Sequence, residues 1–338
     1  MQQAHNKKVS LKFIAELAGC STTTVSNVLN NKGLFGEEIR DKILDIVKKY
    51  SYKMNPSARA LRLGKSETVA LVFYRPNVDI FKSEYYLTMT CGFQKRLSEL
   101  GYEILLSEIP QDVAEAGAKP RFVSRGKADA IVALGRIPDG AAESLKNCGL
   151  PMLMLDSFYA GIDSIYTDGL SATQKLVERL AAQGHKKIAY LAYDNSDFNT
   201  DMRIKGYLAA VENAGLAPRV VRNFATNEEG GDELQKLLEL PDRPTAVLAS
   251  NDDLATSLMC RALSMGFEVP EAVAFCGFDD TVLATRCTPP LTTVHVDCEE
   301  IGAVGAETVL RRIASPSAEP KTEIVKVDIV ERASTLGA

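Results

Sequence analysis

Apolar residues recur at helical spacing in two short stretches near the start of the chain. The first stretch consists of Leu11, Ile14, Ala15, Leu17 and Ala18, and the second consists of Val25, Val28 and Leu29. Between them, Gly19 suits the left-handed backbone that ends many helices, and Ser21 is a favoured N-cap residue. The pattern predicts a helix-turn-helix, an arrangement in which the second helix lies in the major groove of DNA.

Polar residues fill the outer face of the second predicted helix. They are Thr22, Thr23, Ser26 and Asn27. A third helix is expected over residues 37–49, which begin with two acidic residues, end with two basic ones and carry apolar residues at core spacing between them. Residues 1–54 are therefore predicted to form a small all-α domain, called the head below.

The segment 55–66 begins with Asn55-Pro56, which interrupts the helical pattern. Ser57 to Leu63 has the length of about two helical turns, and an isolated helix this short is mostly unfolded in water. Two interpretations remain open. The segment is either a flexible basic linker or a stretch that folds only when it docks on DNA.

Short apolar runs alternate with amphipathic stretches in residues 67–338, called the core below. Strands are expected at 68–74, 102–108, 129–134 and 151–156, and again at 186–193, 219–224, 245–250 and 272–278. Helices are expected between them, for example at 86–99, 170–183, 203–214, 229–239 and 252–265. Such alternation predicts two α/β lobes, split near residues 163–168, each with a parallel sheet covered by helices on both faces. Residues 291–294 and a strand pair near 322–331 should cross between the lobes and act as a hinge.

Polar residues follow several of the predicted strands, where ligands of parallel sheets bind. Asp156, Asn251 and Asp279 stand at such ends, Arg203 is expected to begin a helix, and Tyr85 and Tyr86 open the first helix of the core. Each acid or amide alone is explained by a helix cap or a turn. Together these residues offer hydrogen-bond acceptors, one guanidinium group and apolar ring faces, which is the set that a polyhydroxyl ligand requires.

Charge is distributed unevenly along the chain. Residues 1–65 hold 12 Lys and Arg against 5 Asp and Glu, a net charge of +7, whereas residues 66–338 carry a net charge of −12. Only the basic part is therefore expected to contact nucleic acid. The seven cysteines are scattered and never spaced as CxxC, and the three histidines lie far apart, so we expect reduced thiols and no zinc site. With no signal peptide or membrane-spanning run, a cytoplasmic protein is expected.

The segment IAELAGCSTTTVSNVLNN resembles the N-terminal region of the lac repressor/galactose repressor family of bacterial transcription regulators, and runs such as RPTAVLASNDDLATSLMCRALSMGFEVPEAVAFCGFDD extend the resemblance through the core. The resemblance implies a core like that of periplasmic sugar-binding proteins and a hinge helix at residues 55–66, whose Leu61 wedges between base steps in the minor groove. It implies base contacts from Thr22, Thr23 and Asn27 and phosphate contacts from Ser21, Thr24 and Asn30. It also implies effector contacts from Arg203, Asn251 and Asp279, with Asp156, Tyr85 and Tyr86 lining the cleft.

Two positions depart from the family pattern. Asn27 stands where the family usually has an arginine that reads guanine, and asparagine prefers adenine, so we expect an adenine in each half-site. Gly36 replaces a common serine cap, so slightly weaker contact with the DNA backbone is expected. The chain ends without an appended leucine heptad, and the resemblance therefore implies a homodimer.

The leading interpretation is an effector-controlled repressor that binds double-stranded operator DNA and requires no cofactor or metal. The effector is expected to be a sugar or sugar phosphate, with a nucleobase as the second choice. An α/β enzyme acting on sugars or nucleosides is the first alternative, although no glycine-rich fingerprint follows the first core strand and no GxSxG motif is present. A free-standing sugar-binding protein is the second, but the attached basic head argues against it.

Overall fold

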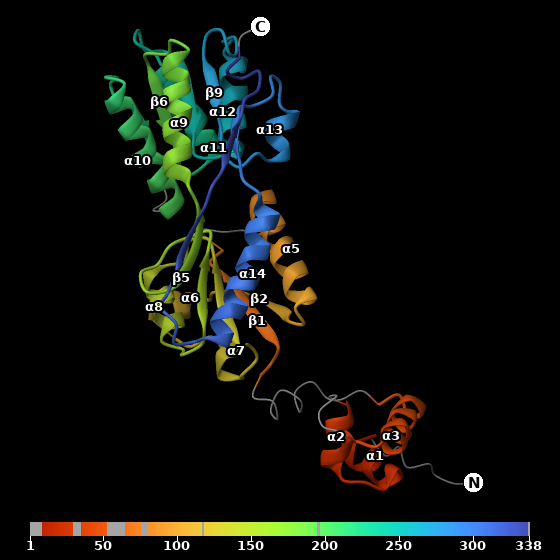
Figure 1. Cartoon of the computed structure of the whole chain (residues 1–338). Helices are drawn as coiled ribbons and strands as arrows, with labels where there is room; N and C mark the ends of the chain where they lie inside the picture. Colours follow the sequence, from red (N-terminus) through yellow and green to blue (C-terminus); the bar gives the residue numbers. More distant parts are fainter. Residues whose placement is uncertain are drawn as a thin grey trace, which may run out of the picture. The chain divides into compact units, whose positions relative to one another are not determined.

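The computed structural model describes residues 9–29, 35–52, 65–75, 80–116, 118–194 and 197–336 (Figure 1). It divides into two compact units, Met1–Ser66 and Glu67–Ala338. Asn30, Leu61 and most of the predicted hinge segment 55–66 lie outside the described residues.

The head contains three helices around one small apolar core. These are α1 (Leu11–Ala18), α2 (Thr22–Leu29) and α3 (Glu37–Lys49). Ser10 caps α1 by accepting a hydrogen bond from the Phe13 amide, and Gly19 ends it with a φ of 72°. The buried side chains at the centre of the head are Ile14, Ala15, Ala18, Val25, Val28 and Ile43.

Two expectations about the head are wrong. Leu17, assigned to the apolar stripe of α1, is 42% exposed, because it lies one residue away from the buried Ala18 on a helix that turns by about 100° per residue. Ser26, assigned to the outer polar row of α2, is only 1% exposed, because α2 packs against both α1 and α3 and so buries a wider arc of its surface. The outward row is therefore shorter than the sequence suggests.

The first lobe of the core is built on a six-stranded parallel sheet, counted over the described residues, with strand order β11-β5-β4-β3-β1-β2. Its strands are β1 (Thr68–Phe73), β2 (Glu103–Glu108), β3 (Ala130–Leu134), β4 (Met152–Leu155), β5 (Asp163–Thr167) and β11 (Thr322–Val325). Helices α5 (Glu84–Glu99) and α14 (Cys298–Ala314) pack on one face. The opposite face is covered by α6 (Gln111–Ala116), α7 (Arg121–Ser124) and α8 (Asp139–Lys146).

The second lobe repeats this plan with a four-stranded parallel sheet in the order β7-β6-β8-β9, again counted over the described chain. Its strands are β6 (Ile188–Leu191), β7 (Val220–Val221), β8 (Ala246–Ala249) and β9 (Ala274–Cys276). On one face lie α9 (Gly169–Ala182) and α10 (Phe198–Asn213), and on the other α11 (Asn227–Leu238) and α12 (Asp252–Ser264). A short helix, α13 (Val282–Arg286), follows β9.

Alternate residues of each strand face opposite sides of the sheet, as a period of two requires. In β1, Leu71 faces the α5 side, whereas Val72 faces the opposite helices. In β6, Tyr190 and Leu191 divide in the same way between the two faces. The central strands β1, β3 and β8 are thus buried on both faces, which explains why they appear in the sequence as continuous apolar runs.

The predicted division into two sets of four strands needs correction. Residues 163–168 were expected to separate the lobes, but Asp163–Thr167 is the strand β5 of the first sheet, parallel to β4. Asp163 is buried there because Arg312 donates two hydrogen bonds of 2.7 Å to its carboxylate, and the Lys321 amide donates another. Because this strand begins with polar residues, apolar runs in the sequence did not predict it.

The described chain passes between the lobes three times, from β5 to α9, from β10 (Thr293–His295) to α14, and from β11 to β12 (Asp328–Val330) (Figure 1). β10 and β12 pair antiparallel beside the second sheet, with Val294 opposite Ile329. The two segments predicted to cross are thus two of the three crossings. The third, β5 to α9, lies where the sequence suggested only a boundary.

Candidate functional site

The exposed surface of α2 carries the predicted DNA-contacting residues that the structure describes. Ser21 caps the helix, since its hydroxyl accepts a hydrogen bond of 3.0 Å from the Thr24 amide. Thr22 and Thr23 are exposed, and Thr24 and Asn27 are half-buried. A short polar row therefore faces outward from the N-terminal half of α2, which is the part of a recognition helix that reaches base edges.

A cavity of ≈ 260 Å³ lies in the core, lined by residues of both lobes. All six predicted effector-binding residues are on its wall: Tyr85, Tyr86, Asp156, Arg203, Asn251 and Asp279. The first three belong to the first lobe and the others to the second. The cavity is thus placed where closure of one lobe on the other would enclose a ligand.

Arg203 is 6% exposed and lies in the second turn of α10, not at the helix start as expected, because the helix begins at Phe198. One of its terminal nitrogens donates to the Ser250 carbonyl, and the other lies 3.6 Å from the Asp279 carboxylate. Its guanidinium carbon is 3.6 Å from the ring centroid of Phe278. The buried cation is therefore held in one orientation by a carbonyl, a carboxylate and a ring face.

Asp156 directly follows β4 and has a left-handed backbone, at φ 61°, which few non-glycine residues adopt. Its carboxylate accepts hydrogen bonds from the Tyr85 hydroxyl at 2.9 Å and from the Asn199 amide at 3.0 Å. Asn199 belongs to the second lobe, so this bond joins the lobes. Burial, together with the nearby charge of Asp197, raises the pKa of Asp156 to about 7, although Arg203 opposes the rise.

The two tyrosines of α5 enclose the first-lobe side of the cavity. Their rings meet edge to face, with centroids 5.2 Å apart. Burial first, and the charge of Asp156 second, raise the pKa of both hydroxyls well above the usual value. Both phenols therefore stay protonated at neutral pH and act as hydrogen-bond donors.

Asn251 and Asp279 close the second-lobe side. Asn251 caps α12, since its side-chain oxygen accepts from the Leu254 amide at 2.9 Å, so the structural role weighed from the sequence is present while the residue also faces the cavity. Asp279 has a φ of 113°. Burial raises the pKa of Asp279 well above its usual range, against the opposing charge of Arg203.

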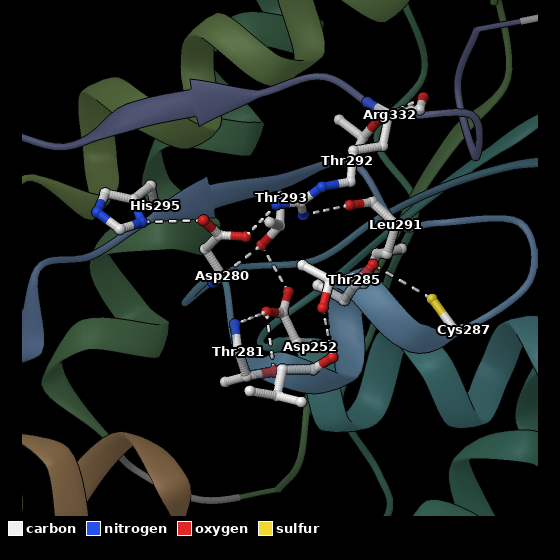
Figure 2. Close-up of polar contacts among 12 residues, drawn as sticks. Asp252, Asp280, Thr281, Thr285, Cys287, Leu291, Thr292, Thr293, His295 and Arg332 are labelled. Carbon is white, nitrogen blue, oxygen red and sulfur yellow. Dashed lines mark hydrogen bonds and ion pairs between the residues drawn. The ribbon is translucent and has the colours of Figure 1, made fainter.

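The residue after Asp279 connects the cavity wall to the crossing segments (Figure 2). Asp280 also has a positive φ, 57°, and its carboxylate accepts from Arg332 at 2.5 Å and contacts His295 Nδ1 at 2.9 Å. Beneath it, buried Asp252 accepts from the Thr293 hydroxyl at 2.5 Å and from the Thr281 amide at 2.8 Å. Two adjacent strained residues thus face the cavity and the hinge.

Several cavity residues were missed from the sequence. They are Ser83, Arg136, Tyr193, Asp197, Asn199, Thr200 and Ser250. Asp197, Asn199 and Thr200 belong to the start of α10, which the apolar pattern placed five residues too late. The sequence signal that would have found them is Asp197 as an N-cap residue. Its carboxylate accepts a hydrogen bond of 3.0 Å from the amide of Thr200, three residues later.

Comparison with known proteins identifies the architecture. Residues 10–55 match the family described as bacterial regulatory proteins, lacI family, and residues 177–335 match the periplasmic binding protein-like domain. By these matches the chain joins a lacI-family head to a periplasmic binding protein-like core. Its lacI-family relatives include the regulator DegA of Bacillus subtilis (strain 168), which is 28% identical, with 97% of this chain and 98% of DegA aligned.

Two other lacI-family proteins align over almost their whole length. The ribose operon repressor of Escherichia coli (strain K12) is 27% identical, with 96% of this chain and 99% of the repressor covered. The crystal structure of the lac repressor dimer bound to operator and the anti-inducer ONPF superposes with a TM-score of 0.86 at 24% identity, covering 98% of this chain and 100% of that chain. The likeness to the lac repressor structure shows the fold alone.

In the described part of the chain, no group of three or more His, Cys, Asp or Glu is arranged to hold a metal ion. All seven cysteines are free. None of the helices in the same residues combines the length and apolar character needed to span a membrane.

Proposed function

We propose that this protein is a homodimeric transcriptional repressor whose affinity for operator DNA is controlled by a small molecule bound in the cavity between the core lobes. The observation that carries the proposal is the combination, in one chain, of a capped helix-turn-helix with an exposed polar row and a two-lobed core with a polar cavity. The named relatives support it, because they include a ribose operon repressor and an operator-bound dimer. Cytoplasmic action follows, since operator DNA lies there.

The proposed control depends on two core arrangements with different effector affinities. An effector shifts the balance between them only by the difference in its affinities for the two states. Asp156 and Asn199 hydrogen-bond across the cavity, so a ligand that engages either residue changes how the lobes contact each other. The Asp279–Asp280 pair then links that change to the crossing strand β10, since the Asp279 amide donates to the Val294 carbonyl at 2.9 Å.

Base reading is assigned to Thr22, Thr23 and Asn27, with Ser21 and Thr24 on phosphates. Selection of operators from a random DNA pool should yield a near-palindromic site with an adenine opposite Asn27, because an asparagine amide pairs with adenine N6 and N7. Asn27→Ala should lose that preference at a cost of ~1–3 kcal/mol against the matched base. A strict guanine preference that survives in the variant would contradict the assignment. Wild-type protein on a site mutated elsewhere is the control.

A further inference from the structure

The cavity wall carries more carboxyl groups than guanidinium groups. Its carboxylates are Asp156, Asp197 and Asp279, and its guanidinium groups are Arg136 and Arg203. Arg203 is already committed, because it donates to the Ser250 carbonyl, lies 3.6 Å from Asp279 and stacks on Phe278. Its charge therefore acts chiefly on Asp279. Burial nevertheless holds the pKa of both Asp156 and Asp279 above the ordinary carboxyl range, so the wall already disfavours added negative charge.

Asp156 and Asp197 approach the cavity from opposite lobes. Asp156 follows β4 in the first lobe, and Asp197 precedes α10 in the second, where one of its oxygens accepts from both the amide and the hydroxyl of Thr200 at 3.0 Å. The charge of Asp197 is the largest cause, after burial, of the raised pKa of Asp156, and it outweighs the opposing effect of Arg203. The two carboxylates thus repel each other across the cavity.

The same wall holds buried polar atoms that the protein itself leaves without a hydrogen bond. Asn199 Oδ1 and Ser250 Oγ are two of them, on residues that are 5% and 3% exposed. The Asn199 amide nitrogen is used, donating to the carbonyl and the carboxylate of Asp156 at 3.0 Å, so its oxygen is the free acceptor. A buried acceptor of this kind favours a ligand that donates hydrogen bonds.

We infer that the effector carries no negative charge: the cavity takes a hydrogen-bond-donating polyol, neutral or bearing a protonated amine, and rejects phosphate esters and carboxylates. This inference rests on the proposed function, which makes the cavity the effector site. A hydroxyl or ammonium group donates to Asp156, Asp197 and Asn199 Oδ1, whereas a phosphate or carboxylate adds like charge in a buried space where repulsion is weakly screened. It narrows the effector class by excluding the sugar phosphates.

The full chain should be tested by thermal shift and calorimetry against a panel grouped by charge. Glucose, ribose and inositol represent neutral polyols, and glucosamine represents the amines. Glucose 6-phosphate, ribose 5-phosphate and glucuronate represent the anions, and adenine, adenosine and AMP extend the panel to nucleobases. A ligand held by the native state raises the melting temperature by mass action. We expect every binding compound to be neutral or cationic and to bind at least tenfold more tightly than its anionic counterpart.

A pair of variants isolates the charge. Asp197→Asn removes one wall charge while keeping a residue that caps α10, so the fold is retained. Asp201→Asn makes the same change on the same helix at a carboxylate that pairs with Arg222 and does not line the cavity. Asp197→Asn should reduce the discrimination between a neutral ligand and its phosphate or carboxylate by about tenfold, and Asp201→Asn should leave it unchanged.

The outcomes separate this inference from the proposed function. A phosphate ester or a uronate as the tightest ligand overturns the charge inference while the effector role of the cavity stands. Equal discrimination in the Asp197→Asn variant and wild type also overturns it. If nothing in the panel binds, both the inference and the proposed effector site are rejected. Tight binding of adenine with no binding of polyols would preserve the exclusion of anions but reject the polyol class.

Discussion

At the scale of single residues, the buried Arg203 side chain holds two groups of the cavity wall in position. Arg203→Ala should abolish the effector response, because the removed side chain positions Asp279 and the Ser250 carbonyl on the cavity wall. Effector affinity should fall at least tenfold, since a hydrogen bond to a charged group is worth ~1.5–3 kcal/mol. Operator affinity without effector should stay within a few-fold of wild type.

The measurement for Arg203 is DNA binding by fluorescence anisotropy, with and without the effector found by screening. Arg222→Ala is the matched control, because Arg222 pairs with Asp201 on the same helix outside the cavity wall. A normal effector response in the Arg203 variant would show that the pocket assignment is wrong.

Asp156 makes stability depend on pH in an unusual direction. Its pKa is about 7 in the folded protein, above the ordinary carboxyl value of 3.8, so the folded state binds the proton more tightly than the unfolded state does. This contribution to stability is fully present below about pH 4 and is lost as pH rises through 7. Asp156→Asn removes it, so the stability of the variant relative to wild type should rise between about pH 4 and pH 7, by up to ~1.4 kcal/mol per pH unit, and stay constant at higher pH. Urea unfolding at several pH values measures the free energy of unfolding of both proteins. A difference between them that does not change with pH would contradict the prediction.

Sequence alone could indicate strand-end residues but not their partners. Asp156, Asn251 and Asp279 follow apolar runs, so their common location on one cavity was predictable from the carboxyl-edge rule for parallel sheets. Asn199 follows no apolar run, and Ser250 was expected only as the last residue of the strand 245–250. Their side chains face the cavity only because α10 begins at Phe198 and β8 ends at Ala249.

At the scale of helices and strands, glycines set the distance between packed helices. A Cβ built on Gly302 of α14 would lie 2.1 Å from the Met89 carbonyl oxygen and 2.7 Å from the Phe93 amide nitrogen of α5. In the second lobe, a Cβ built on Gly206 of α10 would lie 2.2 Å from the Leu170 carbonyl oxygen of α9. Each lobe therefore has one helix pair whose backbones meet without side chains between them.

Gly302→Ala should destabilise the core by ~1–3 kcal/mol or more, because the methyl group would meet backbone atoms that cannot move separately from their helix. Gly231→Ala in α11 is the control, since its added Cβ lies 3.6 Å from the flexible Arg261 side chain. That change should be neutral or stabilising by up to ~1 kcal/mol, from helix propensity. Urea unfolding compares the two. Equal stabilities would mean that α5 and α14 separate easily.

Elements with strong apolar periodicity were predictable, and those held by polar or distant contacts were not. β1, β3 and β8 are buried on both faces and stand out in the sequence. β5 begins with the buried Asp163, which Arg312 neutralises from 149 residues away, and β11 is largely exposed as an edge strand. Their assignment to the first sheet depends on tertiary contacts that no local pattern records.

At the scale of the whole molecule, the uneven charge of the chain determines how it meets DNA. The net charge is +7 over residues 1–65 and −12 over residues 66–338, so electrostatic attraction to phosphates is confined to the N-terminal part. Operator affinity should therefore fall steeply with salt, with a log–log slope of about −0.9 per phosphate neutralised. Titration of labelled operator at four salt concentrations, with non-operator DNA of equal length alongside, measures the slope. An operator affinity that does not change with salt would contradict a dimer whose side chains contact DNA phosphates.

The three crossings have a consequence for how the protein is made. The first lobe needs α14 to cover one face of its sheet and β11 to complete the sheet, and the second needs β12 and Ser334, which bonds to Phe275 and Thr292. As the ribosome works from N- to C-terminus, neither half can be finished until nearly all of the chain has emerged. A stop codon even thirty residues early thus leaves both halves incomplete, and no truncated product retains an intact sensor.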